Sequence, residues 1–299
     1  CCMHPKYSVR SEALQLAVQA ACGLTGELDP TAVVLLPAHD VLPFENLSPH
    51  PDIQEQRAVT LWKITRGAAR LIILPIESAC YRVFSAGHYA NLACTLRRGE
   101  EADPEMLVAH LAGVGYQSVD MVEMRGQYAL RGGIFDIYPP EMDGPLRIEF
   151  LGDEIESMRR FDPETQRSSA PIDEAILLPL TETPMTNALL SRVHTRLSRQ
   201  HLEGEEDAVH AAVETEGTNV FPGWEFFAAA ASAESGPQQT VFDLIPKCRI
   251  FVEEPSMVQN QLDRWWNKVE QRHERSGIDT LFTPADLYLT PWEWQTRMV

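Results

Sequence analysis

The stretch that most limits the fold of this chain runs from Arg125 to Arg167. Strand-forming residues fill three short runs in it, at 128–130, 134–138 and 146–151, and turn residues separate them. Pro139-Pro140 ends the first pair of strands, because proline has no N–H group to donate to a strand partner. The Asp-Gly-Pro and Gly-Asp turns that follow each favour a reversal of the chain. The sequence therefore predicts two short antiparallel ribbons joined by a proline-rich turn.

One face of the third run is a candidate docking surface. Side chains alternate along a strand. We therefore expect the core to take Leu146, Ile148 and Phe150, and the outer face to carry Arg147, Glu149 and Leu151. An arginine beside an exposed apolar residue is typical of an interface hot spot. Arg131 stands before two glycines, which favour a bulge or a close backbone approach, and we expect it to project onto the same face. The alternative is an ordinary solvated strand face with a weak Arg–Glu pair.

The segments on either side of the ribbon alternate between strand-like and helix-like patterns. Before it, apolar runs at 31–36 and 71–76 predict buried strands, and helical spacing predicts helices at 11–22, 53–65 and 77–83. After it, we expect a strand at 175–180, helices at 186–202 and 205–216, a small-residue loop at 228–239, a strand at 248–252 and a helix at 256–272. This order of elements favours an α/β domain with a parallel sheet.

The ribbon belongs to a different unit. Asp103-Pro104-Glu105 predicts the start of a helix, with Asp as the N-cap and Pro at the first helical position. One helix against a small antiparallel sheet makes an α+β module. We therefore predict an α/β domain in two parts, residues 1–90 and 173–299, interrupted by an inserted α+β module at residues 91–172.

Composition limits the function classes. The 299 residues carry a net charge of −18, which argues against non-specific nucleic-acid binding as the main activity, because that binding depends on neutralising phosphates. The six cysteines form no C-x-x-C pair, which is typical of reduced thiols in a cytoplasm. No apolar run is long enough to span a bilayer, and no membrane partner is expected. The sequence starts with Cys1 rather than Met, so we expect a fragment of a longer protein.

Motifs for catalysis are missing from the sequence. No G-x-x-x-x-G-K-[ST] phosphate loop occurs, and the glycines at 23 and 26 have no lysine after them. We interpret Asp153-Glu154 as a solvated turn and not as a metal-binding helicase motif. Neither H-E-x-x-H nor G-x-S-x-G is present. Cys1-Cys2-Met3-His4 lacks a second ligand pair at zinc spacing, and we interpret it as a chain terminus. We predict no catalytic, cofactor or metal site in this chain.

Two segments carry a resemblance to known families. The run GQYALRGGIFDIYP, followed by LRIEFLGDEIESMRRFDPETQRS, resembles the interaction domain shared by the excision-repair helicase UvrB and the transcription-repair coupling factors. The segment LPFENLSPHPDI, from Leu42 to Ile53, and then Arg57, resembles the coupling factors in particular. The tyrosine-rich DNA-clamping hairpin of UvrB has no counterpart here. The chain is thus identified as similar to the N-terminal part of a transcription-repair coupling factor.

The resemblance implies a fold and a partner. The family has a degenerate, non-hydrolysing P-loop-like α/β domain that is split by the interaction domain, and this domain binds the repair protein UvrA. The family's contact residues are two arginines and an aromatic, which correspond to Arg131, Arg147 and Leu151, with leucine in place of the aromatic. The resemblance further implies that ATP and Mg²⁺, RNA polymerase and double-stranded DNA are bound by parts of the full-length cytoplasmic protein that this chain lacks.

Three other functions remain open from the sequence. The chain could be the N-terminal part of a UvrB-like excision-repair helicase subunit, because the ribbon motif is common to both families. It could be a stand-alone ATPase or nuclease, against which the missing phosphate loop speaks. It could be a DNA-binding domain, which the acidic net charge opposes.

Overall fold

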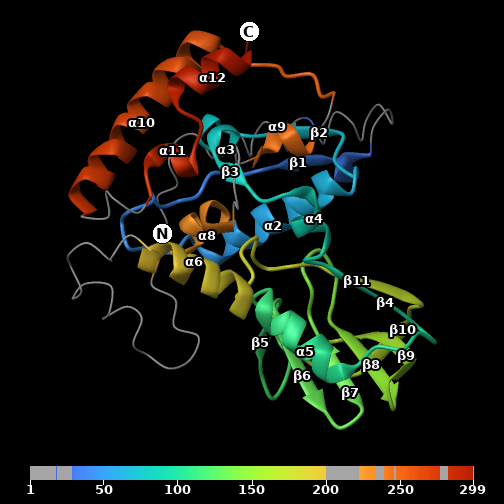
Figure 1. Ribbon diagram of the computed structural model, residues 1–299. Helices are drawn as coiled ribbons and strands as arrows, with labels where there is room; N and C mark the ends of the chain where they lie inside the picture. Colours follow the sequence, from blue (N-terminus) through green and yellow to red (C-terminus); the bar gives the residue numbers. More distant parts are fainter. Residues whose placement is uncertain are drawn as a thin grey trace. The chain divides into compact units, whose positions relative to one another are not determined.

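The computed structural model describes residue 18 and residues 29–199, 222–232, 239–245, 247–276 and 282–298. The chain divides into two compact units (Figure 1). The first contains the described residues up to His88 and from Thr186 onwards, and the second is Tyr89–Met185. The predicted helix at 11–22 and the predicted helix at 205–216 lie outside the described residues, apart from residue 18.

The first unit begins with a short parallel pair of strands. A 3-10 turn η1 (Pro30–Ala32) leads into β1 (Val33–Leu35), which pairs with β2 (Leu71–Ile73) in parallel, Val33 opposite Leu71. Helix α2 (Pro51–Thr65) connects them, as expected for a parallel crossover. Its N-terminus is capped by the His50 ring nitrogen Nδ1, which accepts the N–H of Asp52 at 3.2 Å. The predicted strands at 31–36 and 71–76 and the helix at 53–65 are confirmed in outline.

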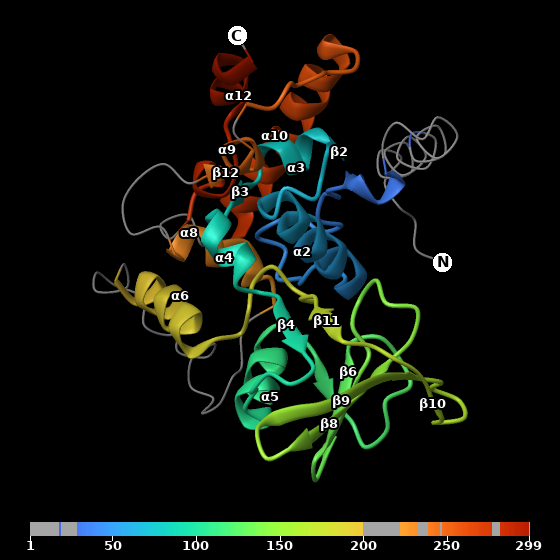
Figure 2. The same ribbon diagram turned by 90° about the vertical axis from the view of Figure 1, so that its right-hand side faces the viewer.

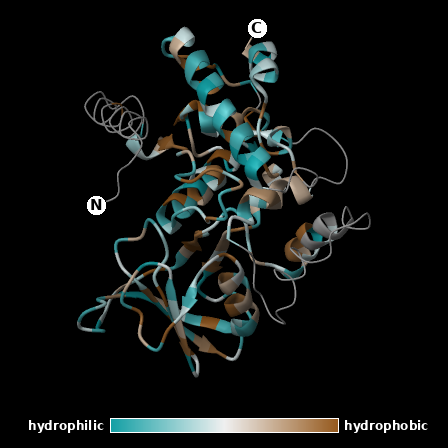
Figure 3. Ribbon diagram, turned by 90° about the vertical axis from the view of Figure 1, so that its left-hand side faces the viewer, coloured by the Kyte–Doolittle hydropathy of each residue, from teal (hydrophilic) through white to brown (hydrophobic). Residues whose placement is uncertain are grey.

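The rest of the first unit is mainly helical. Its elements are α3 (Ile76–Cys80), β3 (Arg82–Val83), α4 (Ala86–Ala90), α6 (Asn187–Arg199), α8 (Glu225–Ser232), β12 (Gln239–Thr240), α9 (Val241–Leu244), α10 (Pro255–Ser276), α11 (Pro284–Leu287) and α12 (Pro291–Met298). The chain passes to the second unit within α4. Strands β12 and β3 form an antiparallel pair. Helix α10 is largely hydrophilic in Figure 3, and the buried residues along it are Leu262 and Val269.

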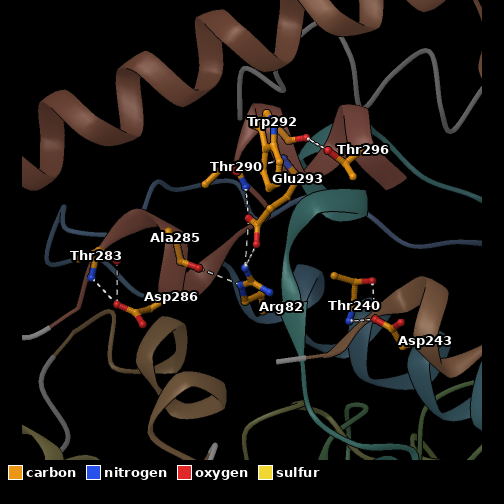
Figure 4. Close-up of polar contacts among 10 residues, drawn as sticks. All are labelled: Arg82, Thr240, Asp243, Thr283, Ala285, Asp286, Thr290, Trp292, Glu293 and Thr296. Atoms are coloured by element: carbon orange, nitrogen blue, oxygen red, sulfur yellow. Dashed lines mark hydrogen bonds and ion pairs between the residues drawn. The ribbon is translucent and has the colours of Figure 1, made fainter. Parts of the chain in front are cut away.

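An arginine ties β3 to the C-terminal helices (Figure 4). Arg82 donates from Nε to the carbonyl of Ala285 at 2.9 Å and from Nη2 to Glu293 Oε1 at 3.0 Å. The same Glu293 carboxylate accepts the backbone N–H of Thr290 at 2.8 Å and so caps α12. Although partial burial acts to raise the pKa of Glu293, the Thr290 N–H and the Arg82 charge outweigh it and hold the pKa below its usual value. Segments about 200 residues apart are thereby joined by one charged network.

Two predictions for the first unit are wrong. Residues 248–252 form no strand, and Phe251 is 88% exposed, because an apolar run becomes a strand only where a partner strand is available. The predicted loop at 228–239 begins as helix, since α8 includes Ala228–Ser232 and buries Ala228 and Ala230 completely. Alanine has the highest helix propensity, and its small side chain allows α8 to pack closely beside α6. The first unit is mixed α/β with small sheets.

The second unit is built on a six-stranded sheet and a separate two-stranded one. Its elements are β4 (Cys94–Arg97), α5 (Pro104–Gly113), β5 (Gln117–Ser118), β6 (Gln127–Arg131), β7 (Ile134–Ile137), β8 (Leu146–Leu151), β9 (Glu154–Phe161), β10 (Ser168–Pro171) and β11 (Glu174–Leu177). Six strands lie in the order β10-β9-β8-β7-β6-β5, and only β5 and β6 are parallel neighbours. The predicted strands at 128–130, 134–138 and 146–151 are confirmed as β6, β7 and β8.

Helix α5 lies beside this sheet in both Figure 1 and Figure 2. It starts where the sequence predicts, because the Asp103 carboxylate accepts the N–H groups of Glu105 and Met106 at 2.8 and 3.3 Å. Its residues Leu107 and Leu111 are buried. One face of the sheet supplies the fully buried side chains Phe135, Ile137, Leu146 and Ile148. The predicted inward position of Phe150 is only partly met, since it lies half-buried at the end of β8.

The inserted unit ends later than residue 172. Strand β11 pairs antiparallel with β4, Ala175 opposite Leu96, and not with a strand of the first unit. Beyond it, the N–H of Leu180 donates to the carbonyl of Val114 at 3.0 Å, and that of Met185 to the carbonyl of Gly113 at 2.8 Å. These bonds hold 174–185 in the second unit. The pattern of apolar residues at 175–180 showed a strand but carried no information on which strand it would pair with.

Candidate partner-binding site

Asp136 is a buried carboxylate at the centre of the sheet. It lies on β7, opposite Arg147 of β8 and Ala129 of β6, and its side chain has no solvent exposure. Two arginines satisfy it. Arg147 donates from Nε to Oδ1 at 2.7 Å and from Nη2 to Oδ2 at 2.8 Å, and Arg131 donates from Nη2 to Oδ2 at 2.7 Å. A buried charge needs such partners, because an unpaired carboxylate in this position would be strongly destabilising.

Arg147 is mostly enclosed. Its side chain is 19% exposed, and its guanidinium lies 4.7 Å from the centre of the Phe161 ring. Besides the paired bonds to Asp136, it donates from Nη1 to the backbone carbonyl of Gln166 and from Nη2 to the Gln166 side chain, both at 3.3 Å. The hydrogen bonds to Asp136 raise the pKa of Arg147 above its already high ordinary value. All three nitrogens of this guanidinium therefore donate within the protein.

A tight turn places Gln166 over Arg147. The Asp162 carboxylate accepts the N–H groups of Glu164 and Thr165 at 2.9 and 2.8 Å, and these bonds lower the pKa of Asp162. Gln166 adopts a positive φ of 58°, and its amide donates to the carbonyl of Pro163 at 2.8 Å. This turn is formed by the segment DPETQR, residues 162–167, at the end of the ribbon.

Arg131 differs from Arg147 in being half exposed, at 49% of its side chain. It ends β6 just before a two-residue turn in which Gly132 has a φ of +61°. A Cβ atom on Gly133 would lie 2.9 Å from the carbonyl oxygen of Phe150, and that residue's N–H donates to the Gly133 carbonyl at 2.7 Å. The close backbone approach predicted for the two glycines is confirmed. The register irregularity lies elsewhere, between β8 and β9.

Three more side chains complete the surface around Arg131. Ile134 lies opposite both Arg131 and Glu149 in the sheet and is 40% exposed, and Leu151 is 69% exposed. Glu149 accepts a hydrogen bond from the Ser157 hydroxyl at 2.6 Å. We call Arg131, Ile134, Asp136, Arg147, Glu149 and Leu151 the arginine face. Sequence reasoning missed Ile134, although its even spacing from Asp136 along β7 places both on one face.

The arginine face lies near two hairpin turns at one end of the sheet. The turn after β6 is Gly132-Gly133, and the turn after β8 is Gly152-Asp153. Gly152 has a φ of +65°, which favours glycine there. Both Asp153 and Glu154 are exposed, as expected for a solvated turn. Among the described residues, no group of three or more histidine, cysteine or acidic side chains is arranged to hold a metal ion. Gly23 to Gly26 and Cys1 to His4 lie outside the described residues.

The second unit contains no lysine, so its basic side chains are arginines and one histidine, His110. Arginine suits this site because its planar fork binds a carboxylate with two parallel hydrogen bonds, as Arg147 does with Asp136. Within the part of the chain that the structure describes, no helix is both long enough and apolar enough to cross a membrane.

The second unit is similar in sequence to a known class of domain. Residues 94–182 match the sequence model of the UvrB interaction domain. The match covers the whole six-stranded sheet, helix α5 and the β4–β11 pair.

Over most of its length the chain is similar in sequence to transcription-repair-coupling factors. It is 27% identical to that of Haemophilus influenzae over 275 residues, which is 91% of this chain and 24% of the relative. The factor of Myxococcus xanthus is 28% identical over 306 residues, covering 96% and 25% of the two chains. A Staphylococcus aureus factor is 31% identical over 170 residues, covering 57% and 14%. The predicted resemblance is therefore confirmed, and the chain spans about a quarter or less of the length of these relatives.

Proposed function

We propose that this chain is the recruitment module of a transcription-coupled nucleotide excision repair factor and that its arginine face binds UvrA. The proposal is carried by one observation: Arg131, Ile134 and Leu151 are exposed on three successive strands of a sheet that lies within the match to the UvrB interaction domain. The similar proteins are named transcription-repair-coupling factors, which supports the assignment of the module to transcription-coupled repair.

The chemistry of the face suits a mixed polar and apolar contact. Arg131 offers a half-exposed guanidinium for a carboxylate of the partner, and such charge-assisted hydrogen bonds are about twice as strong as neutral ones. Ile134, directly opposite Arg131, and Leu151 on β8 offer exposed apolar side chains. Centrally placed arginines and apolar anchors supply most of the energy of typical interfaces. The remaining contacts would then exclude water from this centre.

Binding of the 299-residue chain to purified UvrA, measured by calorimetry, tests the proposal. We expect the double variant Arg131→Ala/Arg147→Ala to lose binding. Arg98→Ala is the matched control, because Arg98 is also an arginine of the second unit, is 56% exposed and forms one ion pair, with Asp173 at 3.3 Å. The control should bind as the unmodified chain does. Unchanged affinity in the double variant, with a native circular dichroism spectrum, would contradict the proposal.

We propose that the first unit is a degenerate P-loop-like domain without ATPase activity of its own. The similarity to the coupling factors supports the fold. The absence of a G-x-x-x-x-G-K-[ST] sequence in the chain supports the lack of ATPase activity, because ATP hydrolysis of that type needs the lysine of the loop. ATP-driven movement on double-stranded DNA, with Mg²⁺, and binding to RNA polymerase would belong to the full-length protein in the cytoplasm. Measured ATP turnover by the purified chain, abolished by a chelator of Mg²⁺, would overturn this part of the proposal.

A further inference from the structure

The two arginines of the arginine face are not equivalent. Arg147 is 19% exposed and uses Nε, Nη1 and Nη2 as donors to Asp136 and Gln166. Arg131 is 49% exposed and donates only through Nη2, to Asp136, within the described part of the chain. The Nε and Nη1 donors of Arg131 therefore remain for an acceptor on a partner, whereas each guanidinium nitrogen of Arg147 already donates to Asp136 or Gln166.

We infer that Asp136 is a positioning residue for partner binding: with Arg147 holding its carboxylate, it orients Arg131 toward a carboxylate of the partner. Arg131 makes the contact, and Arg147 acts through Asp136. The inference rests on the proposed function, because UvrA is taken as the partner. It assigns Asp136 a role, and it separates the roles of two arginines that the sequence treats alike.

The hydrogen bonds show how the positioning works. Arg147 binds both oxygens of Asp136, at 2.7 and 2.8 Å, which sets the orientation of the carboxylate. Oδ2 then accepts a second bond, from Arg131 at 2.7 Å. A free arginine side chain would lose much rotamer freedom on binding. Because Arg131 is already held, less of that cost falls on the association step, and its affinity for a partner carboxylate rises accordingly.

The surroundings of Arg131 strengthen the contact. Ile134 lies directly opposite Arg131 in the neighbouring strand, and Leu151 is the next exposed apolar side chain beyond Glu149 on β8. When a partner covers these two side chains, water leaves the neighbourhood of the guanidinium. A charge-assisted hydrogen bond gains strength in such a low-dielectric environment. The partner surface that fits therefore has a carboxylate beside an apolar area.

Four variants of the 299-residue chain test the inference by calorimetry with purified UvrA. Methionine replaces each arginine because it keeps an unbranched apolar stem without the charge. We expect Arg131→Met to weaken binding about 30-fold, because it removes the charged contact with the partner. We expect Arg147→Met to weaken binding only about threefold, because it removes a residue that orients Asp136 and does not itself contact the partner. Asp136→Asn should weaken binding about fivefold, because Arg131 is then no longer held. In the double variant Asp136→Asn/Arg131→Met, the affinity should equal that of Arg131→Met within about twofold, since residues that act through one contact are not additive.

The outcomes are separable. Equal losses in Arg147→Met and Arg131→Met, unchanged or tighter binding by Asp136→Asn, or a full additional loss in the double variant would each overturn the inference. Failure of the unmodified chain to bind UvrA would contradict the proposed function instead, and the inference would fall with it. Thermal unfolding of every variant shows whether the sheet is intact.

A second variant tests the inference if Asp136→Asn does not fold. Replacing a buried ion network by apolar residues of similar volume is often nearly neutral for stability. Asp136→Leu/Arg147→Met removes the Asp136 carboxylate and the Arg147 guanidinium in this way and leaves Arg131 and Leu151 unchanged. We expect this folded variant to bind UvrA about fivefold more weakly than the unmodified chain, by the same loss of positioning. Binding as tight as that of the unmodified chain would show that Asp136 has no positioning role.

Discussion

Truncation of Leu151 provides a direct measure of the apolar contact on the arginine face. Leu151 is 69% exposed, so its side chain adds little to the stability of the second unit alone. Leu151→Ala removes three carbon groups, worth about 0.8 kcal/mol each on full burial. Scaled by the 69% that a partner can still cover, the loss is about 1.7 kcal/mol, or about 15-fold in affinity.

The assay is calorimetric titration of the chain with UvrA, alongside thermal unfolding. Ile176 provides the matched control, because it is also an apolar strand residue of the second unit and is 37% exposed, but lies on β11 away from the arginine face. We expect Ile176→Ala to leave the affinity unchanged and Leu151→Phe, which restores the aromatic implied by the resemblance, to tighten binding. An affinity of Leu151→Ala within twofold of the unmodified chain, or equal losses in both alanine variants, would refute the reasoning.

Three predictions concern stability. Arg82→Ala should destabilise the first unit by about 2 kcal/mol in urea unfolding, because it removes charged hydrogen bonds to Glu293 and the Ala285 carbonyl. The control Arg98→Ala removes an exposed ion pair and should lower the free energy of unfolding by less than about 0.5 kcal/mol. Equal losses in the two variants would contradict the prediction. The pKa of Glu293 is lowered in the folded chain, so its contribution to stability is present above the ordinary glutamate pKa of about 4.3 and is lost as the pH falls through the lower folded value. The stability difference between the unmodified chain and Glu293→Gln should accordingly shrink toward low pH, and a pH-independent difference would refute the assignment. Gly133→Ala should cost about 1–3 kcal/mol because its Cβ would lie 2.9 Å from a backbone oxygen, whereas Gly113→Ala meets open space and should cost nothing.

The ribbon could be predicted from the sequence because its signals are local. Alternation of apolar residues defines β6, β7 and β8, and glycine and proline mark their ends. The same local reasoning placed Arg147 and Leu151 on one face of β8. It failed where the partner in space decides the outcome: residues 174–177 pair with β4, whereas residues 248–252 pair with no strand among the described residues and residues 248–251 are exposed.

The hydrogen bonds that Asp136 accepts from Arg131 and Arg147 could not be predicted from the sequence. In a chain with 43 acidic residues, nothing in the sequence distinguishes Asp136 from the other carboxylates. Its role depends on the register that places it opposite Arg147 and on the burial that removes it from water. The cover provided by Gln166 depends on a positive φ at a non-glycine residue, which no propensity predicts. Resemblance to a family pointed to both arginines, but it carried no information on the difference in their exposure and hydrogen bonding.

The absence of lysine from residues 89–185 has a consequence for the chemistry of this module. Acetylation and ubiquitin attachment act on lysine amines, so neither can alter the charge of the second unit through its side chains. Arginine also keeps its charge at any pH at which the chain is folded. The positive charges on this surface are therefore constant over physiological pH, and amine-reactive crosslinkers will not report contacts made by the side chains of residues 89–185.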